Sequence, residues 1–585
     1  MPMDRFIRSP ILWLTLALVV HAACAIVPEP ERGALGVVAI GEENATRVGA
    51  AVLAAGGNAV DAVVAVGYTL AVTHPHAGNL GGGGFMMVRL MDGTAVAVDF
   101  RETAPAAARR DLFLDARGEV VPGRSTVGWL AVGVPGSVAG LNLARERWGT
   151  RPLAELLAPA IRLARDGHRL DDAHARRMAE ALPAMAPFPA TAALYSNHGK
   201  PYPEGALWRQ PELARLLERI ARAGDAGFYR GATARQIAQA AAAGGGLLAE
   251  GDLAAYRPVV REPLRAAYRG HELLLMPPPS SGGVAIAQAL AMLDLLDAPA
   301  GRDARAIHAY VEVLRRVYAD RSEHLGDPAA MHVTPARLLA RSYLRQRLAD
   351  FSWQRATPSA AIAPGHPEAE ETTHYAVVDR WGNAVAVTTT LNGAFGAKVA
   401  VPGLGLLLNN EMDDFAAKPG VPNLYGLVGG EVNAVAPGKR MLSSMSPSIV
   451  TRDGRVRLVV GTPGGSTIIT TVLQILRGVV EEGLTLEAAV VRPRIHHQWL
   501  PDEVVYEPGA ISAAVAAQLR TLGHTLRERH TIGEANCIAV RRDGAATAVV
   551  DPRGDGLALG ATESPARTLL PLHRDLARAG GAELR

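Results

Sequence analysis

The chain has 585 residues, of which 49% are apolar, and it includes 61 glycines and 39 prolines. This length exceeds what one hydrophobic core usually supports, so two cores or one large layered core are expected. The formal net charge is only +3, and no long basic run occurs. This balance argues against a nucleic-acid partner, and none is expected.

The N-terminal segment has the features of a signal peptide. Arg5 and Arg8 precede an apolar run over 11–20, and a small-residue cleavage signal ends at Ala25. We therefore expect residues 1–25 to be removed and the protein to be exported, either to a periplasm or out of the cell. The run is too short to span a bilayer, and no later run reaches about 18 uninterrupted apolar residues, so no stable membrane anchor is expected. Lipid attachment through Cys24 is the weaker alternative.

Beyond the leader, turn signals and periodic segments alternate. Strand-like runs meet at four short turns, which are Asp92-Gly93, Arg380-Trp381-Gly382-Asn383, Asp453-Gly454 and Asp543-Gly544. Amphipathic helices are predicted over Leu153 to Asp166, Pro211 to Ala223, Ala232 to Ala243, Gly283 to Leu296, Ala304 to Leu325 and Pro335 to Asp350. Antiparallel hairpins combined with such helices predict a layered α/β sandwich.

A stretch rich in Ala, Pro and acidic residues, Thr357 to Glu371, lacks periodicity and is predicted to be an exposed connector. It ends directly before Thr372, which opens a predicted strand over 372–378. This arrangement suits self-cleavage, in which the Thr372 hydroxyl attacks the carbonyl of Glu371 and hydrolysis of the ester frees the Thr372 amine. A free α-amine has a reference pKa of roughly 7.7 to 8.0, so it can act as general base for its own hydroxyl. The alternative is that Thr372 and Thr373 are ordinary β-branched strand residues.

Motifs elsewhere in the chain favour the catalytic interpretation of Thr372. Those that follow it are Thr388-Thr389-Thr390-Leu391-Asn392, Asn409-Asn410-Glu411-Met412-Asp413-Asp414-Phe415, Ser443-Ser444-Met445-Ser446-Pro447 and Gly461-Thr462-Pro463-Gly464-Gly465-Ser466. Those that precede it include Gly56-Gly57-Asn58-Ala59-Val60-Asp61-Ala62, Gly78-Asn79-Leu80-Gly81-Gly82-Gly83-Gly84-Phe85, Asp99-Phe100-Arg101-Glu102-Thr103-Ala104-Pro105 and Gly326-Asp327-Pro328. With these motifs in order, the chain resembles the gamma-glutamyltransferase family, the glutathione hydrolases, from about residue 34 to its end.

The resemblance implies a fold, a maturation step and an activity. The fold is the four-layer αββα sandwich of N-terminal-nucleophile hydrolases, with two stacked antiparallel sheets flanked by helices. Self-cleavage would give a large subunit, residues 26–371, and a small subunit, residues 372–585, which form a heterodimer. The enzyme would cleave the γ-glutamyl amide bond of glutathione and related compounds and pass the γ-glutamyl group to water or to amino acid or peptide acceptors. No cofactor is implied.

The resemblance also implies roles for individual residues. Thr372 corresponds to the nucleophile, Thr390 to the hydroxyl that helps to hold it, and Gly464 and Gly465 to an oxyanion hole formed by backbone N–H groups. A γ-glutamyl donor has a zwitterionic end, which requires groups of both signs. Arg101, Ser443 and Ser444 correspond to the carboxylate site, and Asn392, Glu411 and Asp414 to the ammonium site. Taken singly, Arg101 could be a surface residue, Ser443-Ser444 a turn, and Gly464-Gly465 a bend before a helix capped by Ser466.

A loop over 419–430 matches the lid that many family members fold over the γ-glutamyl pocket, and Tyr425 corresponds to the aromatic residue of that lid. Its presence favours a glutathione-type enzyme over lidless relatives that include cephalosporin acylases. Two alternatives remain, an N-terminal-nucleophile amidase or acylase for a cephalosporin or glutaryl group, and an unprocessed, exported amino-acid-binding protein. Two fragments on a denaturing gel would favour an enzyme over the binding protein.

Two further motifs are assigned no ligand. The run Gly81 to Gly84 leads into a predicted strand and lacks the Lys of a phosphate loop, so nucleotide binding is not expected. His496-His497 has no ligand-spaced partners, and adjacent side chains on an extended chain point to opposite sides. A structural role is therefore predicted for this pair, and no metal site is expected.

Overall fold

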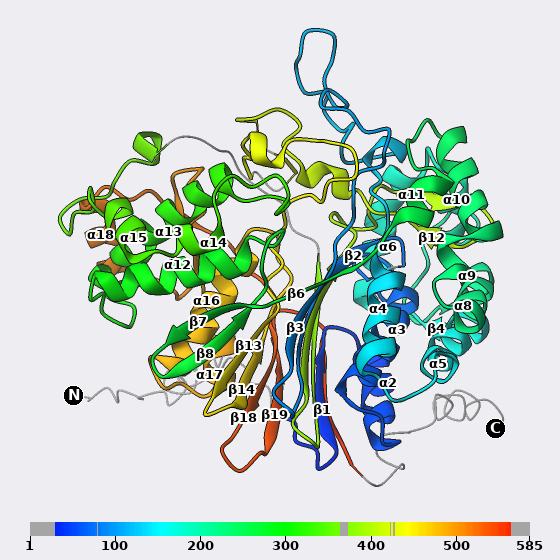
Figure 1. Cartoon of the computed structure of the whole chain (residues 1–585), viewed down its shortest axis with the longest axis horizontal. Helices are drawn as coiled ribbons and strands as arrows, with labels where there is room; N and C mark the ends of the chain where they lie inside the picture. The colour runs from blue at the N-terminus through cyan, green and yellow to red at the C-terminus, as the bar shows by residue number, and fades with distance from the viewer. Residues whose placement is uncertain (1–29, 79, 363–371, 422, 425–426, 563–585) are drawn as a thin grey trace, which may run out of the picture.

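The computed structural model describes residues 30–78, 80–362, 372–421, 423–424 and 427–562. Two antiparallel sheets lie face to face in the centre, with helices on both outer sides (Figure 1). The predicted four-layer αββα sandwich is therefore confirmed. The predicted signal peptide, Glu371 and Tyr425 lie outside the described residues.

The larger sheet has the strand order β20-β1-β9-β10-β2-β3-β6. Its strands are β1 (Gly36–Ile40), β2 (Gly83–Arg89), β3 (Ala95–Phe100), β6 (Val259–Arg261), β9 (Thr373–Asp379), β10 (Ala384–Thr390) and β20 (Leu557–Ala561). Strands β9 and β10 lie at its middle, between β1 and β2. The hairpin that follows Thr372 is thus surrounded on both edges by strands from the N-terminal part of the chain.

The smaller sheet has the order β19-β18-β14-β13-β8-β7. Its strands are β7 (Leu264–Tyr268), β8 (His271–Leu275), β13 (Ser448–Arg452), β14 (Arg455–Val460), β18 (Asn536–Val540) and β19 (Ala546–Val550). All four predicted hairpin turns join neighbouring antiparallel strands. Short strands outside the two sheets are β4 (His168–Arg169), β5 (Leu207–Trp208), β11 (Ala400–Val401), β12 (Leu406–Leu407), β15 (Ile495–His496), β16 (Val504–Tyr506) and β17 (Leu526–Glu528).

Two helical layers bury the outer faces of the sheets. The layer on the larger sheet contains α2 (Glu43–Ala54), α3 (Ala59–Thr73), α4 (Ser137–Trp148), α5 (Leu153–Asp166), α6 (Asp172–Met185), α7 (Pro189–Tyr195), α8 (Pro211–Ala223), α9 (Ala226–Tyr229), α10 (Gly231–Ala243) and α11 (Glu250–Ala255). The other contains α12 (Gly282–Leu295), α13 (Ala304–His324), α14 (Pro335–Leu338), α15 (Arg341–Arg347), α16 (Thr467–Val480), α17 (Leu486–Val491) and α18 (Ala513–Thr521). One large apolar core lies between the larger sheet and its helices, and a second one includes the facing sides of the two sheets and the helices on the smaller sheet, so the chain has two cores as its length predicts.

Five of the predicted helices are confirmed to within one residue at each end, and the sixth is wrong. The segment Pro335 to Asp350 forms two short helices, α14 and α15, because the backbone of Ala340 is extended, with ψ of 130°. The side chain of Gln288 donates a hydrogen bond to the carbonyl of Leu338 at 3.0 Å. This bond occupies a carbonyl group that a continuous helix would use for its own backbone ladder.

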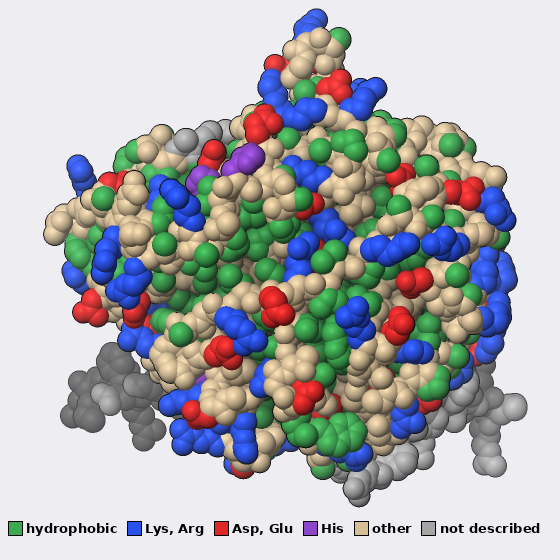
Figure 2. Space-filling model, in the orientation of Figure 1, with side chains coloured by type: hydrophobic (Ala, Val, Ile, Leu, Met, Phe, Trp, Pro, Cys, Tyr) green, Lys and Arg blue, Asp and Glu red, His purple; other side chains and the backbone are tan. Residues whose placement is uncertain are grey.

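The surface in Figure 2 shows acidic and basic side chains interspersed, in keeping with the small net charge. Within the part of the chain that the structure describes, we find no helix with both the length and the apolar character needed to cross a membrane.

Candidate active site

The hairpin of β9 and β10 places two threonines opposite each other at its open end. The register pairs Thr373 with Thr389, and the next step of that register sets Thr372 opposite Thr390. Thr372 is half-buried, while Thr390 is buried and its hydroxyl accepts a hydrogen bond from the backbone N–H of Asn392 at 2.8 Å. The proximity predicted from the hairpin is therefore present.

These threonines line a pocket whose other residues come from both halves of the sequence. Its other lining residues are Arg101, Arg321, Asn392, Asp414, Leu427, Ser443, Ser444, Met445, Gly465 and Ile468. Most of the residues singled out from the sequence thus meet in one place. Glu411 and Gly464 do not line the pocket, but each lies next to a residue that does.

Arg101 is fully buried at the centre of a charge cluster that also contains the buried Glu102 and Glu411 and the partly exposed Asp414. Its Nη1 atom lies 2.5 Å from a carboxylate oxygen of Glu411 and 3.6 Å from one of Glu102, and its Nη2 atom donates to Asp414. Its Nε atom donates to the carbonyl of Met441 at 3.3 Å. The interpretation of Arg101 as a surface residue is therefore wrong. One guanidinium here faces three carboxylates.

Burial and mutual repulsion change the protonation of these groups. Burial opposes the charge of Arg101, but Glu411 and Asp414 outweigh it and raise its pKa. Burial also raises the pKa of Glu411 well above its ordinary value and raises that of Asp414, although Arg101 acts in the opposite direction on both. The single positive charge of Arg101 does not fully compensate the acidic groups around it. A second cation that entered the pocket would therefore be attracted to these groups.

Glu102 gives the cluster a testable effect on stability. Burial raises the pKa of Glu102 to about 8 from an ordinary value of 4.5, so the folded chain binds an additional proton between these values. The corresponding stability is fully present below about pH 4.5 and is lost as the pH rises through about 8, by at most about 1.4 kcal/mol per pH unit. Glu102→Gln, which stays neutral, should flatten this loss in urea unfolding measured from about pH 5 to 8. An unchanged pH dependence in the variant would contradict the assignment.

Ser443 and Ser444 lie between the pocket and two neighbouring segments. The backbone N–H of Ser443 donates to the carbonyl of Pro279 at 2.9 Å, and its carbonyl accepts from the side chain of Ser281 at 2.7 Å. Arg321 donates to the hydroxyls of Ser281 at 3.0 Å and Ser444 at 3.1 Å. The two serines are therefore fixed in position and adjoin a second arginine, which together suit a carboxylate.

Arg321 and Glu102 are components of this site to which the sequence analysis gave no role. Arg321 lies in α13, where Arg315 and Arg316 are also buried, each paired with Glu312. When α13 is interpreted as an amphipathic helix, its arginines are expected on the surface. The periodicity of the sequence therefore did not indicate that Arg321 is buried in the site. For Glu102 a signal was present, since it adjoins Arg101 within a recognised motif.

Gly464 and Gly465 form the bend between β14 and α16. Their φ angles are 131° and 51°, conformations that side chains rarely allow. The following Ser466 does not cap α16 with its side chain, as the alternative interpretation suggested. Its hydroxyl donates instead to Gln498 at 2.6 Å, and its carbonyl accepts from the Tyr318 hydroxyl at 2.6 Å. Hydrogen bonds from buried side chains thus fix the position of the bend.

The histidine pair has the predicted structural character. His496 lies 2.9 Å from the Thr470 hydroxyl through Nδ1 and 2.8 Å from the side-chain amide oxygen of Gln498 through Nε2. His497 accepts from the backbone N–H of Trp499 at 3.0 Å. His496 therefore belongs to the same network that supports the bend at Ser466.

The described part of the predicted lid contacts the acidic side of the pocket. The Asn423 side chain donates to Asp414 at 3.1 Å, and the backbone N–H of Leu424 donates to Asp413 at 2.7 Å. Asp413 also accepts from Ser125 at 2.5 Å. The two adjacent aspartates therefore differ, because Asp414 faces the pocket and Arg101 whereas Asp413 anchors the loop.

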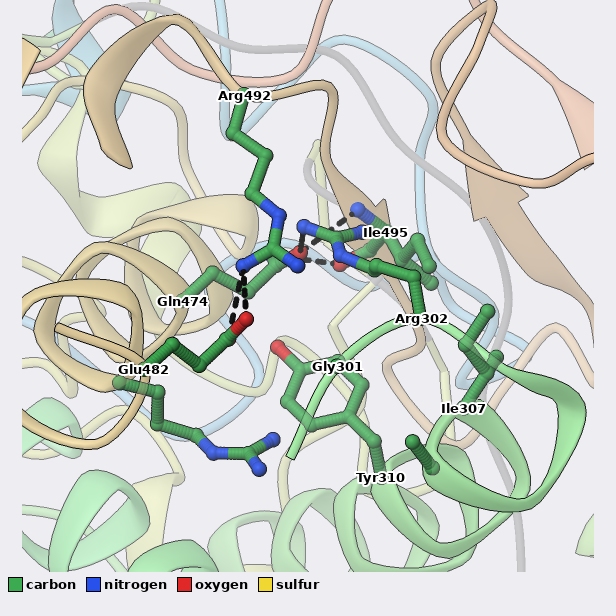
Figure 3. Close-up of a pocket in the computed structure, with 10 residues that line it drawn as sticks. Gly301, Arg302, Ile307, Tyr310, Gln474, Glu482, Arg492 and Ile495 are labelled. Carbon is green, nitrogen blue, oxygen red and sulfur yellow. Dashed lines mark hydrogen bonds and ion pairs between the residues drawn. The ribbon is translucent and has the colours of Figure 1, made fainter. Parts of the chain in front are cut away.

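A second pocket lies near the other end of α16 (Figure 3). Arg302, Arg477, Arg492 and Glu482 line it, and Glu482 accepts two hydrogen bonds of 2.8 Å from Arg492. The described residues that line it include no Ser, Thr or Cys. It therefore lacks the threonine and serine hydroxyls that line the pocket beside Thr372.

The chain is similar to known proteins over most of its length. The family model described as Gamma-glutamyltranspeptidase matches residues 45–561. The glutathione hydrolase proenzyme of Escherichia coli K12 is 47% identical over 533 residues, covering 90% of this chain and 91% of that protein. The glutathione hydrolase proenzyme of Pseudomonas aeruginosa PAO1 is 45% identical over 563 residues, covering 94% and 99%.

Among solved structures, the cephalosporin acylase from Bacillus halodurans is similar with a TM-score of 0.82 and 26% sequence identity, covering 91% of this chain and 97% of that one. The fold is therefore shared with an acylase, while the higher sequence identities are to glutathione hydrolases. The family match over most of the chain and nearly half identity to relatives of similar length show that this chain belongs to the gamma-glutamyltranspeptidase family.

Proposed function

We propose that the chain cuts itself before Thr372 and then acts as a gamma-glutamyltransferase and glutathione hydrolase. The observation that carries the proposal is the position of Thr372, opposite Thr390 and in one pocket with Arg101 and Asp414. The relatives are named proenzymes, which accords with a maturation step. Removal of residues 1–25 on export would precede this step.

The subunits proposed to result are residues 26–371 and 372–585. Their strands alternate within the larger sheet, because β9 and β10 of the second pair with β1 and β2 of the first. Separating the subunits would break both ladders and expose the two apolar cores. The fragments should therefore remain together as a heterodimer after cleavage.

The proposed reaction is acyl transfer in two steps. The free amine of Thr372 takes the proton of its own hydroxyl, and the oxygen attacks the γ-carbonyl carbon of the donor. Backbone N–H groups at Gly464 and Gly465 would stabilise the oxyanion, after which the amine product leaves with a proton. Water or the amine of an acceptor then attacks the ester and restores the Thr372 hydroxyl.

The charges of the pocket suit the zwitterionic end of a γ-glutamyl donor. Arg101, Arg321, Ser443 and Ser444 offer donors to its carboxylate, while Asp414 and Asn392 offer acceptors to its ammonium group. Glu411 lies behind Arg101, outside the pocket lining, and would hold the guanidinium in place. The guanidinium of Arg101 alone does not balance the carboxylates around it. The ammonium group of the donor would supply further positive charge.

Comparing two donors tests this assignment against the acylase alternative. A γ-glutamyl anilide and a glutaryl anilide differ only in the α-amino group. Loss of that group leaves the pocket carboxylates without their ligand, so kcat/KM for the glutaryl compound should be lower by about 10⁴-fold. Equal values, or a preference for the glutaryl compound, would favour an acylase. Binding of free glutamate by a single uncut chain would favour the binding protein.

A further inference from the structure

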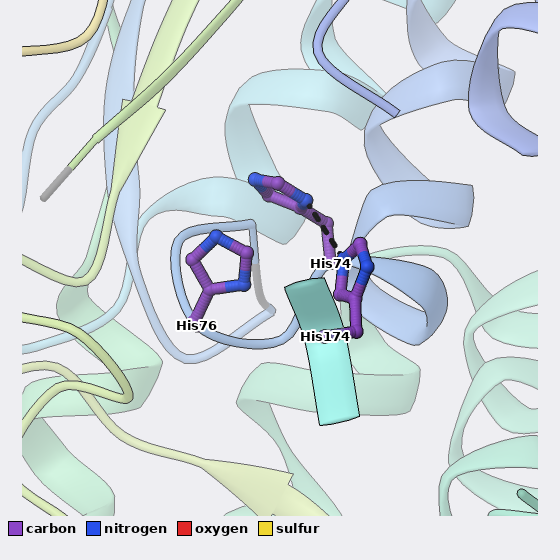
Figure 4. A group of neighbouring side chains, drawn as sticks. All are labelled: His74, His76 and His174. Carbon is purple, nitrogen blue, oxygen red and sulfur yellow. Dashed lines mark hydrogen bonds between the residues drawn. The ribbon is translucent and has the colours of Figure 1, made fainter. Parts of the chain in front are cut away.

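Three histidines from distant parts of the sequence gather on the outer side of the larger sheet (Figure 4). His74 follows the last residue of α3, His76 lies two residues later, and His174 is in the first turn of α6. The ring centres of His74 and His76 are 3.9 Å apart, and His174 lies 5.4 Å and 5.5 Å from them. About 100 residues separate His174 from the other two, so no local spacing indicates the cluster.

The nitrogen atoms are spaced as ligands of one ion require. His74 Nδ1 lies 3.3 Å from His174 Nε2, and one nitrogen from each of the three rings lies within 4.8 Å of the others. Tetrahedral zinc with Zn–N bonds of about 2.0–2.1 Å places its nitrogen ligands roughly 3.3 Å apart. The first pair therefore needs almost no rearrangement.

The protonation of His174 also suits ligation. Its Nδ1 atom lies 2.8 Å from both carboxylate oxygens of Asp171, which can only accept, so Nδ1 carries the proton and Nε2 presents its lone pair to the cluster. A carboxylate that holds the second nitrogen of a histidine ligand is a common support in metal sites.

Arg177 occupies one side of the cluster. Its Nη1 atom donates to His76 Nε2 at 2.9 Å, while His76 Nδ1 is buried without a hydrogen-bond partner among the described residues. Arg177 is half-buried on α6, and its long side chain can turn toward solvent without a backbone change. A bound cation would repel this guanidinium, so its departure would accompany binding.

We propose that His74, His76 and His174 bind one divalent transition-metal ion of the zinc class, with water as a fourth ligand and with Arg177 in contact with the empty site. Neutral imidazole nitrogens are preferred ligands for such ions. The backbone carbonyl of His76 accepts a hydrogen bond from Phe395, three residues after Asn392, at 2.9 Å. Binding would therefore stabilise the loop that leads away from the candidate active site.

A second group, His308, Glu312 and His524, serves as a matched control. His308 Nδ1 and His524 Nε2 share a hydrogen bond of 2.8 Å, His308 Nε2 donates to the carbonyl of Ser352, and Glu312 pairs with Arg315. Among its side-chain nitrogen and oxygen atoms, only His524 Nδ1 has no hydrogen-bond partner in the described residues, and the others are committed to contacts within the protein. No metal is expected there.

The test is titration of the mature protein, without a polyhistidine tag, with Co²⁺ followed by Zn²⁺. We expect a visible absorption band typical of four-coordinate Co²⁺, saturation at one equivalent, and loss of the band when Zn²⁺ displaces Co²⁺. His76→Gln and His174→Gln should each weaken binding at least 10-fold, and Asp171→Asn about 10-fold, because it keeps the helix cap but removes the supporting charge. His524→Gln should leave binding unchanged.

Arg177→Gln provides the sharpest discrimination, since removing a competing cation should tighten binding by 10-fold or more. A histidine cluster with only a packing role predicts no such gain. Hydrolysis of a γ-glutamyl anilide by each variant verifies that it is folded, because none of these residues lines the pocket beside Thr372. The proposal is overturned if neither the unaltered protein nor Arg177→Gln binds one equivalent of Co²⁺, or if binding survives both His76→Gln and His174→Gln.

Discussion

Replacing Thr372 with Ala should leave a single uncut chain and lower γ-glutamyl anilide hydrolysis by at least about 10⁴-fold. The substitution removes the oxygen that would attack both the preceding carbonyl and the donor, so two separate measurements should fail together. A denaturing gel shows the first, and release of the aniline shows the second. Thr372→Ser keeps a hydroxyl at the same position and should restore both, at lower rates.

The adjacent threonine offers a matched control for this prediction. Thr373 is buried in β9 opposite Thr389, and Thr373→Val preserves its β-branched shape. This variant should be cut and should retain most activity. If Thr372→Ala were cut normally, or if it hydrolysed the anilide as fast as the unaltered protein, Thr372 would not be the nucleophile.

The elements that the sequence predicted well have local causes. Pro211 supplies the first residue of α8, and Gly224 follows its end with a φ of 55°. Hairpin turns are likewise local, so the pairing of β9 with β10 followed from their sequence. The break between α14 and α15 was missed because its partner, Gln288, lies on another helix.

The residues of the candidate site also fall into two groups, those that the sequence indicates and those that only the folded structure reveals. Residues within recognised motifs, such as Arg101 and Ser444, were found because several motifs occurred in a fixed order. Arg321 was missed, since only the packing of α13 against the segment around Ser444 reveals its position. The cluster of His74, His76 and His174 was missed because segments about 100 residues apart in the sequence must come together before it exists.

Arg101→Met should have the second largest effect, on folding and on catalysis together. It would leave the carboxylates of Glu102, Glu411 and Asp414 buried without their cation, which typically costs about 3–5 kcal/mol. Loss of the proposed donor contact should lower kcat/KM by about 10³-fold, mainly through KM. Arg101→Lys keeps the charge but cannot reach two carboxylates and the Met441 carbonyl at once, so it should be intermediate in both measurements.

Combining Arg101→Met with Glu411→Gln separates these two effects. The second change replaces an acidic group that the first leaves buried without its cation, so urea unfolding should show part of the lost stability regained. Activity should not return, because the pocket still lacks the guanidinium that would hold the donor carboxylate. Recovery of both stability and KM in the double variant would mean that Arg101 only balances buried acids. Recovery of stability alone would assign it to substrate binding as well.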